Sequence, residues 1–298
     1  MMRKDRVLLL IETNASNDIF SNDWKDNGYC FSTIFKKVSK PLRAIRRLWM
    51  KHNLPFSYLW LDKWFDELDN YDSIILHMSY LTNYLPLVIS KRYPKLKIIG
   101  WYWNTIDNRT LPIDFHNSNI EYWTFDESDA KKYGLKKNIQ YYVTPKNIDS
   151  INKDIDIYFI GRDKGRKEKI LSIKEEAKKQ GLSCDFKIVV NDNDILPYQE
   201  VKKYILRYKA ILEINKDNQS GFTLRALESL FYQTKLITNN SGIVESDFYN
   251  KTNVFILDKD DIKELKSFVL SDYDHSVDVL KKNYDLDRWF NNFYEENS

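Results

Sequence analysis

The chain has 298 residues, 30% of them charged and 43% hydrophobic, so it is long enough to bury a core and to form two domains. Its 46 Lys and Arg against 43 Asp and Glu leave a net charge of only +3, which disfavours a protein dedicated to nucleic acid. Two distant cysteines, Cys30 and Cys184, supply neither a disulfide framework nor a structural zinc site, and the apolar run Val7–Ile11 is too short for a signal peptide or membrane span. We therefore expect a cytoplasmic protein.

Short apolar runs alternate with longer amphipathic stretches, a pattern typical of βαβ units and of parallel sheets covered by helices. In the first half, the predicted strands are Arg6–Ile11, Asp72–Met78, Lys97–Trp103 and Ile120–Phe125. Helices are predicted over Thr33–His52, where apolar residues recur every three or four positions, and over Leu81–Tyr93. Pro41 should start, kink or divide the first of these helices.

The second half repeats this alternation. Its predicted strands are Asp154–Gly161, Asp185–Val190, Ala210–Asn215, Lys235–Thr238 and Val254–Leu257. Its predicted helices are one that ends near Gly181, then Tyr198–Tyr208, Phe222–Tyr232, Asp261–Leu270 and Val277–Tyr294. This order predicts a complete doubly wound α/β domain.

The segment Tyr142–Lys153 is polar, contains a proline and has no clear periodicity, so we place a domain boundary there. The prediction is an N-terminal domain over residues 1–145 and a C-terminal domain over residues 146–275. The aromatic side chains within residues 276–298 indicate a terminal helix that packs back onto the N-terminal domain.

The most informative stretch is NKDNQSGFTLRALESLFYQTKLITNN, where a strand leads into a polar loop, a helix and another strand. Unpaired amides and the positive end of the helix dipole favour an anion such as a diphosphate at the start of this helix. The residues predicted there are Gln219, Ser220, Gly221, Phe222 and Thr223. Arg225 and Glu228 share a helix face; Arg225 could bind the diphosphate, and Glu228 could accept hydrogen bonds from ribose hydroxyls. The alternative is an N-cap loop with a surface ion pair.

A second loop, GRDKGR, follows the first strand of the same domain, at the end where open α/β sheets bind ligands. After Gly161, the cations Arg162, Lys164 and Arg166 could neutralise a diphosphate. The alternative is a solvated turn, because the spacing matches neither a Walker loop nor GxGxxG. Two such loops on one sheet favour the diphosphate interpretation.

Three segments, DIDIYFIGRDKGR, QSGFTLRALESLFYQTKLITNN and WTFDESDAKKYGL, resemble the GT-B fold glycosyltransferases of bacterial surface-polysaccharide synthesis (capsule, exopolysaccharide or lipopolysaccharide). The resemblance implies two Rossmann-like domains facing a cleft, a nucleotide-sugar donor on the C-terminal domain, and a last helix that crosses back. Glu228 resembles the ribose-binding glutamate of this family, Gly161 with Arg162 its diphosphate loop, and the residues from Ser220 to Thr223 its phosphate-facing helix start. Many retaining members carry a glutamate where this chain has Ser220, which leaves donor sugar and stereochemistry open.

The resemblance implies catalysis without a metal or other cofactor, in which cations and helix-end amides stabilise the leaving diphosphate. Asp154-Ile155-Asp156 matches the letters of the DxD motif of metal-dependent transferases but falls at the start of a strand, where a solvated strand entry is the stronger interpretation. An inverting route needs a general base in the N-terminal domain. The candidates near strand ends are Glu12, Asp18, His77 and Asp107. Two of them have an ordinary alternative: His77 fits a core histidine, and Glu12 fits a solvated strand-end carboxylate. Separately, the run Trp101-Tyr102-Trp103 could be a platform for sugar faces or could belong to core and rim packing.

The segment Lys36–His52 carries seven Lys or Arg and no acidic residue, interleaved with apolar residues that include a tryptophan. This pattern favours a peripheral contact with a membrane surface; the alternatives are a solvated helix face or a cationic cleft lining.

The sequence thus predicts a cytoplasmic glycosyltransferase at the inner face of a membrane. It would move a sugar from a nucleotide diphosphate sugar, with a UDP-sugar favoured, to a growing surface glycan or lipid-linked acceptor. The alternatives are a non-catalytic GT-B-like subunit that binds a partner transferase or glycan, a sugar-nucleotide epimerase, and an RNA-binding protein, which the charge balance disfavours.

Overall fold

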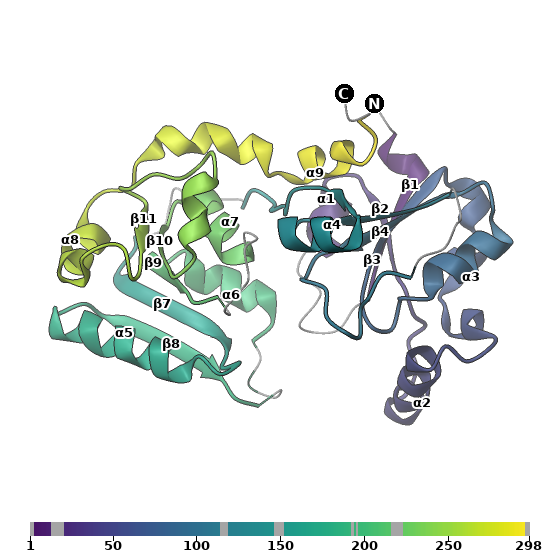
Figure 1. Cartoon of the computed structure of the whole chain (residues 1–298), viewed down its shortest axis with the longest axis horizontal. Coiled ribbons are helices and arrows are strands. Elements are labelled where there is room, and N and C mark those ends of the chain that lie inside the picture. The colour runs from purple at the N-terminus through teal and green to yellow at the C-terminus, as the bar shows by residue number, and fades with distance from the viewer. Residues whose placement is uncertain are drawn as a thin grey trace. The chain divides into compact units, whose positions relative to one another are not determined.

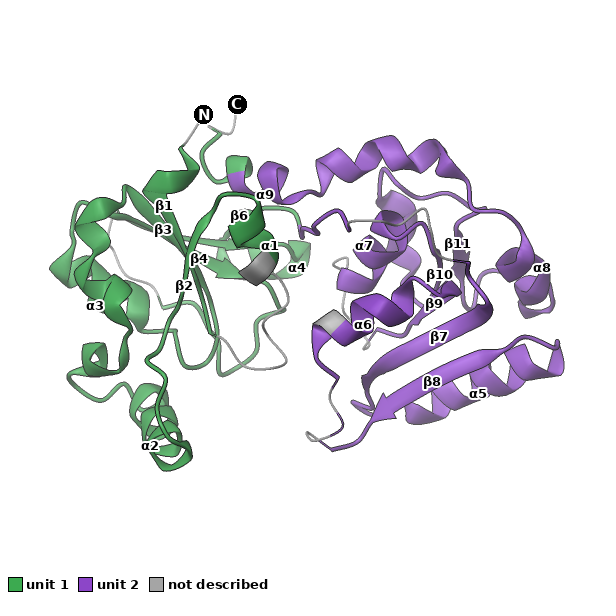
Figure 2. Cartoon of the chain, turned by 180° about the vertical axis from the view of Figure 1, so that it is seen from behind, with its two compact units in different colours: residues 1–139, 291–298 green, residues 140–290 purple. Residues whose placement is uncertain are grey.

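The computed structural model describes residues 3–12, 21–113, 119–145, 152–191, 194, 196–215 and 223–295. The chain divides into two compact units (Figure 2). Unit 1 comprises Met1–Ile139 with Asn291–Ser298, and unit 2 comprises Gln140–Phe290. Each unit is described by itself.

Unit 1 is built on a parallel sheet in the order β2-β1-β3-β4-β5-β6. Its strands are β1 Val7–Ile11, β2 Cys30–Thr33, β3 Ser73–His77, β4 Lys97–Tyr102, β5 Ile120–Thr124 and β6 Lys136–Lys137. Every residue of β1 and β3 is buried, which is why both strands appear in the sequence as unbroken apolar runs. The chain reverses its direction of winding between β1 and β3, so the sheet has a topological switch point there.

Helices and 3-10 turns connect these strands. They are η1 Lys4–Arg6, α1 Ser21–Asp26, α2 Lys40–Lys51, η2 Ser57–Trp60, η3 Lys63–Asp66, η4 Leu68–Asn70, α3 Leu85–Arg92 and α4 Glu127–Tyr133. The predicted helix over Thr33–His52 is wrong in its first part, because β2 ends at Thr33 and α2 begins only at Lys40. Pro41 lies in the first turn of α2, where its missing N–H removes no intrahelical hydrogen bond.

The last described residues of the chain complete the core of unit 1. The ring of Phe293 meets Trp101 and Trp123 edge to face, with centroids 5.8 and 5.1 Å apart. The Tyr294 hydroxyl lies 2.6 Å from Ser73 Oγ. Aromatic packing of this kind is expected from the tyrosine- and phenylalanine-rich end of the sequence.

Unit 2 holds a second parallel sheet, in the order β11-β10-β9-β7-β8 (Figure 1). Its strands are β7 Ile155–Arg162, β8 Cys184–Val189, β9 Tyr208–Glu213, β10 Lys235–Thr238 and β11 Val254–Ile256. The first strand, β7, lies between the second and the third, which is the doubly wound order with its switch point between β7 and β9.

The helices of unit 2 are α5 Lys167–Lys179, α6 Tyr198–Ile205, α7 Leu224–Phe231, α8 Leu265–Leu270 and α9 Leu286–Asn292, the last of which runs on into residues of unit 1. Among the described residues, 3-10 segments with given bounds accompany them: η7 Ser241–Glu245, η8 Ile262–Glu264 and η9 His275–Asn283. The predicted single helix Val277–Tyr294 is therefore two segments, η9 and α9. The predicted fold class, doubly wound α/β with parallel sheets, is confirmed.

Candidate functional site

The carboxyl ends of the strands of unit 2 share one edge of the sheet, because all neighbouring strands are parallel. At the switch point of this edge, β7 ends at Arg162 and β9 ends at Glu213. Residues 163–166 follow β7, and α7 begins shortly after β9. Doubly wound sheets bind their ligands at this kind of crevice.

Arg166 joins the two sides of the switch point. Its guanidinium donates to the carbonyl of Ile214, just beyond β9, and to the carbonyl of Arg162 at 2.9 Å. Burial lowers the pKa of Arg166. Arg166, predicted as a diphosphate ligand, is thus occupied with backbone carbonyls and holds the loop after β7 against the end of β9.

The rest of this loop has a constrained backbone. Lys164 and Gly165 both have positive φ, 47° and 79°, and a left-handed conformation of this kind favours glycine. The Asp163 carboxylate accepts hydrogen bonds from the amides of Arg166 and Lys167 and so caps the start of α5. Arg162 and Lys164 are exposed at the sheet edge, where an anion in solution can reach them.

A buried carboxylate that the sequence analysis did not single out anchors the start of α7. Glu213, only 3% exposed, accepts hydrogen bonds from the hydroxyls of Thr223 and Thr238, the latter at 2.6 Å. Thr223 Oγ1 also accepts from the amide of Arg225 and caps α7. Burial raises the pKa of Glu213 above its usual value. The sequence signal was the single acidic residue inside the apolar run AILEI.

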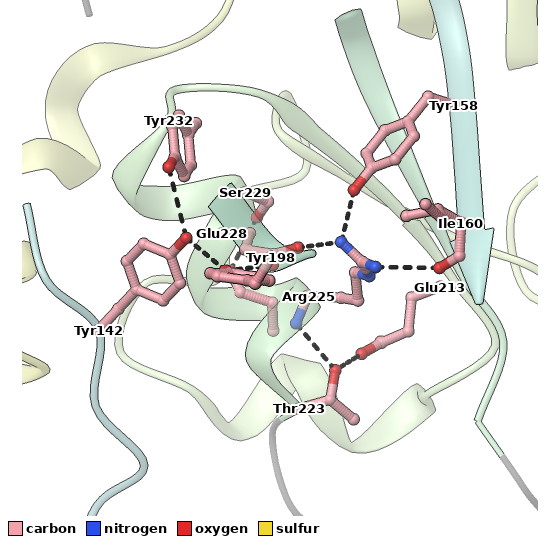
Figure 3. Close-up of polar contacts among 11 residues, drawn as sticks. Tyr142, Tyr158, Ile160, Tyr198, Glu213, Thr223, Arg225, Glu228, Ser229 and Tyr232 are labelled. Atoms are coloured by element: carbon pink, nitrogen blue, oxygen red, sulfur yellow. Dashed lines mark hydrogen bonds and ion pairs between the residues drawn. The ribbon is translucent and has the colours of Figure 1, made fainter. Parts of the chain in front are cut away.

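Arg225 occupies the centre of a polar cluster behind this edge (Figure 3). Its guanidinium donates to the Tyr158 hydroxyl, to the carbonyl of Ile160 at 2.9 Å, and to Glu228. Burial by itself lowers the pKa of Arg225, but the charge of Glu228, the neighbouring Tyr158 and Tyr198, and the hydrogen bond to Glu228 together outweigh burial, and the net pKa is raised. Arg225 therefore ties the first turn of α7 to β7.

Glu228 is buried, with 1% of its side chain exposed. One carboxylate oxygen accepts from Arg225, and the other accepts from the Tyr198 hydroxyl at 2.6 Å. The Tyr142 hydroxyl follows at 2.5 Å from that of Tyr198. Burial raises the pKa of both tyrosines, so both stay protonated at neutral pH. Glu228 is not an open ribose ligand in this state, nor is it the exposed ion pair of the alternative interpretation.

The predicted anion loops are thus brought to one edge as far as the structure describes them. Gly161, Arg162, Lys164 and Arg166 lie on the β7 side, and Thr223, Arg225 and Glu228 lie on the α7 side. Gln219, Ser220, Gly221 and Phe222 lie outside the described residues, as does Asp18 in unit 1.

In unit 1, Glu12 follows β1 and lies at the switch point of that sheet. Ser79, which comes shortly after β3, donates its hydroxyl hydrogen bond to Glu12 at 3.1 Å. Burial raises the pKa of Glu12, and the hydrogen bond and the charges of Arg46 and Arg47 offset this only in part. A carboxylate with a raised pKa is a stronger base, which suits general base catalysis.

The other two candidate bases have different surroundings. His77 is 3% exposed and lies between Trp24 and Trp103, with ring centroids 5.3 and 5.7 Å apart; burial lowers its pKa to about 3. Asp107 forms an exposed ion pair with Arg109 at 2.8 Å, and this hydrogen-bonded partner lowers its pKa. Both are therefore weaker proton acceptors than Glu12. Of the aromatic run, Trp101 and Tyr102 are buried and only Trp103 is half-buried.

Among the described residues, no group of three or more His, Cys, Asp or Glu is placed to hold a metal ion. No helix in the described part of the chain is both long and apolar enough to cross a membrane.

No protein-family model and no curated protein matches the sequence. Among solved structures, TarM superposes on this chain with a TM-score of 0.45 at 12% identity. The match covers 75% of this chain but only 55% of the TarM chain. Another TarM structure, of a mutant from S. aureus, was solved in complex with UDP. An α-glucosyltransferase in complex with UDP and a 13-mer DNA has a TM-score of 0.45 at 12% identity, over 95% of this chain and 93% of that one. A solute-binding protein of an ABC transporter from Conexibacter woesei has a TM-score of 0.29 at 11% identity. The match covers 79% of this chain and 70% of that one. All three TM-scores lie below 0.5, so the function of this chain has to be argued from its own residues.

Proposed function

We propose that this chain is a glycosyltransferase that moves a sugar from a nucleotide diphosphate sugar, with a UDP-sugar favoured, to a growing surface glycan or lipid-linked acceptor. The observation that carries the proposal is the position of the cationic loop after β7. It lies at the topological switch point of unit 2, tied by Arg166 to the end of β9, and it presents Arg162 and Lys164 to solvent.

In this proposal, Arg162 and Lys164 bind the diphosphate, and the amides of residues 219–223 complete the site. Arg166 positions the loop, and Arg225 positions Glu228. Glu228 binds the ribose hydroxyls after the Tyr198 hydroxyl leaves its carboxylate. The leaving diphosphate is stabilised by these fixed cations and amides, without a metal ion.

The reaction forms a bond between the acceptor oxygen and the anomeric carbon of the donor sugar, while the bond from that carbon to the diphosphate oxygen breaks. On an inverting route, Glu12 accepts the proton of the acceptor hydroxyl. Its position at the switch point of unit 1 and its raised pKa support this role over His77 and Asp107.

We further propose that the acceptor and the donor bind to different domains, as the sequence indicated. Residues 1–145 bind the acceptor and residues 146–275 bind the donor, with residues 276–298 returning to the acceptor domain as a terminal segment. The enzyme acts in the cytoplasm, at the inner face of the cell membrane.

The donor site is tested by thermal unfolding of the purified chain with UDP, GDP, CMP and dTDP. A ligand at one hundred times its Kd stabilises the folded state by about 2.7 kcal/mol. We expect one nucleotide, UDP, to raise the Tm, and Arg162→Gln to weaken its binding at least about tenfold, since a hydrogen bond to a charged group contributes about 1.5–3 kcal/mol.

Arg207→Gln is the matched control. Arg207 is an exposed arginine at the amino end of β9, at the opposite edge of the same sheet, where it pairs with Asp154 at 2.8 Å. Equal effects of the two substitutions would contradict the donor site. No shift with any nucleotide would favour the non-catalytic subunit, and conversion of the free sugar nucleotide without an acceptor would favour the epimerase.

A further inference from the structure

Helix α2 stands apart from the sheet of unit 1 (Figure 1). Of its residues, only Met50 is buried. The helix is attached through Trp49, whose indole N–H donates to the carbonyl of Pro55 at 2.9 Å and whose ring meets Trp60 edge to face at 6.1 Å. Most of the α2 surface is therefore in contact with solvent.

One face of α2 exposes large apolar side chains. Leu42, Ile45 and Leu48 are 43%, 46% and 60% exposed. They follow one another at three-residue intervals and so form a stripe along one side of the helix. In an ordinary surface helix an apolar stripe of this kind faces the core, whereas here it faces solvent.

The turn after α2 extends this apolar surface. Leu54, Phe56 and Leu59 are 40%, 59% and 59% exposed. Trp49 connects the two parts, because it follows Ile45 by four residues on the helix and its indole N–H is bonded within the turn. We call α2 together with residues 54–59 the docking surface.

The charge on the docking surface has one sign. Residues 36–59 contain seven Lys or Arg and no Asp or Glu. Lys40, Arg43, Arg47 and Lys51 recur every three or four residues along α2, on the side of the helix away from the apolar stripe, and all four are exposed. Arg46 differs from them, because its guanidinium donates to the carbonyl of Lys36 at 2.9 Å and lies 4.6 Å from the centre of the Phe35 ring.

The geometry points to an anionic lipid bilayer as the occupant of the docking surface. The apolar side chains of α2 and of residues 54–59 enter the interface, and the stripe of cations binds the lipid headgroups. Arg46 fastens α2 to the preceding segment and does not contact lipid. A protein partner fits less well, because the cores of protein–protein interfaces are depleted in charged residues, whereas this surface offers many charges of a single sign.

Two residues of α2 lie within electrostatic reach of the proposed base. The charges of Arg46 and Arg47 act on the Glu12 carboxylate, which follows β1. A membrane bound to α2 would present a lipid-linked acceptor near this carboxylate. This last step rests on the proposed function, whereas the binding of lipid does not.

The test is flotation of the full chain with vesicles of phosphatidylcholine alone and of phosphatidylcholine with 30% phosphatidylglycerol. We expect binding to the anionic vesicles that falls with added salt. The variant Leu48→Ser, Phe56→Asn, Leu59→Ser should bind at least tenfold more weakly; asparagine is chosen because Phe56 has a left-handed backbone. In the variant Arg43→Gln, Arg47→Gln, Lys51→Gln, the affinity for the anionic vesicles should fall about fivefold for each cation removed.

The matched control, Lys167→Gln, Lys178→Gln, Lys179→Gln, removes three exposed charges from α5 in unit 2 and should bind vesicles like the natural chain. Loss of binding in this control, or full binding by the apolar variant, would overturn the proposal. So would an absence of vesicle binding, or a dimer in solution that the apolar variant dissociates. UDP stabilisation, measured on the same variants, separates failure of this inference from failure of the donor site.

Discussion

Both carboxylate oxygens of Glu228 are engaged inside unit 2, one by Arg225 and the other by the Tyr198 hydroxyl. A ribose that binds Glu228 therefore has to replace one of these partners. The bond from Arg225 is charge-assisted and Arg225 is also held by Ile160, so Tyr198 is the partner that costs less to displace.

Tyr198→Phe separates the contribution of this hydroxyl to stability from its competition with a bound ribose. We expect the free energy of unfolding to fall by about 1–3 kcal/mol, because a buried oxygen of Glu228 loses its donor. We also expect the Kd for UDP to fall several-fold, because the nucleotide no longer competes with Tyr198. Tyr204→Phe, on the same helix, should change neither quantity. A weaker affinity for UDP in Tyr198→Phe would mean that Tyr198 supports the site and that ribose does not take its place.

His77 should make the stability of unit 1 depend on pH. Burial lowers its folded-state pKa to about 3, whereas an unfolded histidine titrates near 6.5. Below pH 6.5 the unfolded state therefore binds a proton that the folded state does not, and stability is lost as the pH falls from 6.5 towards 3. Between pH 7 and pH 5 the loss should be about 2 kcal/mol.

Denaturant unfolding at several pH values measures this loss. His77→Phe should remove the His77 contribution and flatten the profile between pH 7 and pH 5. His52→Gln, at an exposed position after α2, should leave the profile as it is. An unchanged slope in His77→Phe would show that His77 is accessible to protons in the folded state, and would return it to consideration as the general base.

At the scale of elements, the buried strands were the most predictable part of the chain. β10 has the bounds that the sequence predicted, and β1, β3 and β7 differ from their predictions by a residue at one or both ends. Parallel strands covered on both faces appear as uninterrupted apolar runs, so their burial is visible in the sequence itself. This property also made the fold class predictable.

The elements that the sequence did not reveal are short or half-buried. β2 has the sequence CFST and no fully buried residue, and β6 consists of two exposed lysines. Their strand conformation comes from pairing with β1 and β5, which lie elsewhere in the sequence. The local sequence pattern therefore does not predict pairing with such partners.

Partners that lie far away in the sequence also limit how much of the site can be predicted. The sequence placed both loops at the carboxyl edge of one sheet; the structure describes the loop after β7 and the start of α7, and it shows that β7 and β9, which precede them, are parallel neighbours. It could not assign Arg166 to a structural role, because the carbonyl that Arg166 binds lies 48 residues further along the chain. It also missed Tyr198 and Glu213, whose importance depends on hydroxyls and carboxylates that only the fold brings together.

At the scale of the whole molecule, both units have a polar contact across the switch point of their sheet. In each, the sheet reverses its winding between two neighbouring strands, and a polar contact spans that point: Glu12 with Ser79 in unit 1, and Arg166 with Ile214 in unit 2. In each unit this contact thus lies at the edge of the sheet where doubly wound folds bind ligands.

The chain returns to unit 1 after unit 2 is complete, so the stability of unit 1 should depend on the last residues. Phe293 is 2% exposed and packs against Trp101 of β4 and Trp123 of β5. Phe293→Ala should lower the free energy of unfolding of unit 1 by about 3–5 kcal/mol, because it leaves a cavity between the two indoles. Amide hydrogen exchange measures the effect as faster exchange in β4 and β5.

Tyr294→Phe is the milder comparison, because it removes only the hydrogen bond to Ser73 and should cost about 1 kcal/mol. Exchange in β7 and β9, and the stabilisation of unit 2 by UDP, should stay unchanged in both variants, since neither residue belongs to unit 2. Unchanged protection of β4 and β5 in Phe293→Ala would contradict the assignment of the terminal segment to the core of unit 1. Faster exchange in both sheets together would mean instead that the two units unfold as one cooperative structure, in which the terminal segment stabilises unit 2 as well as unit 1.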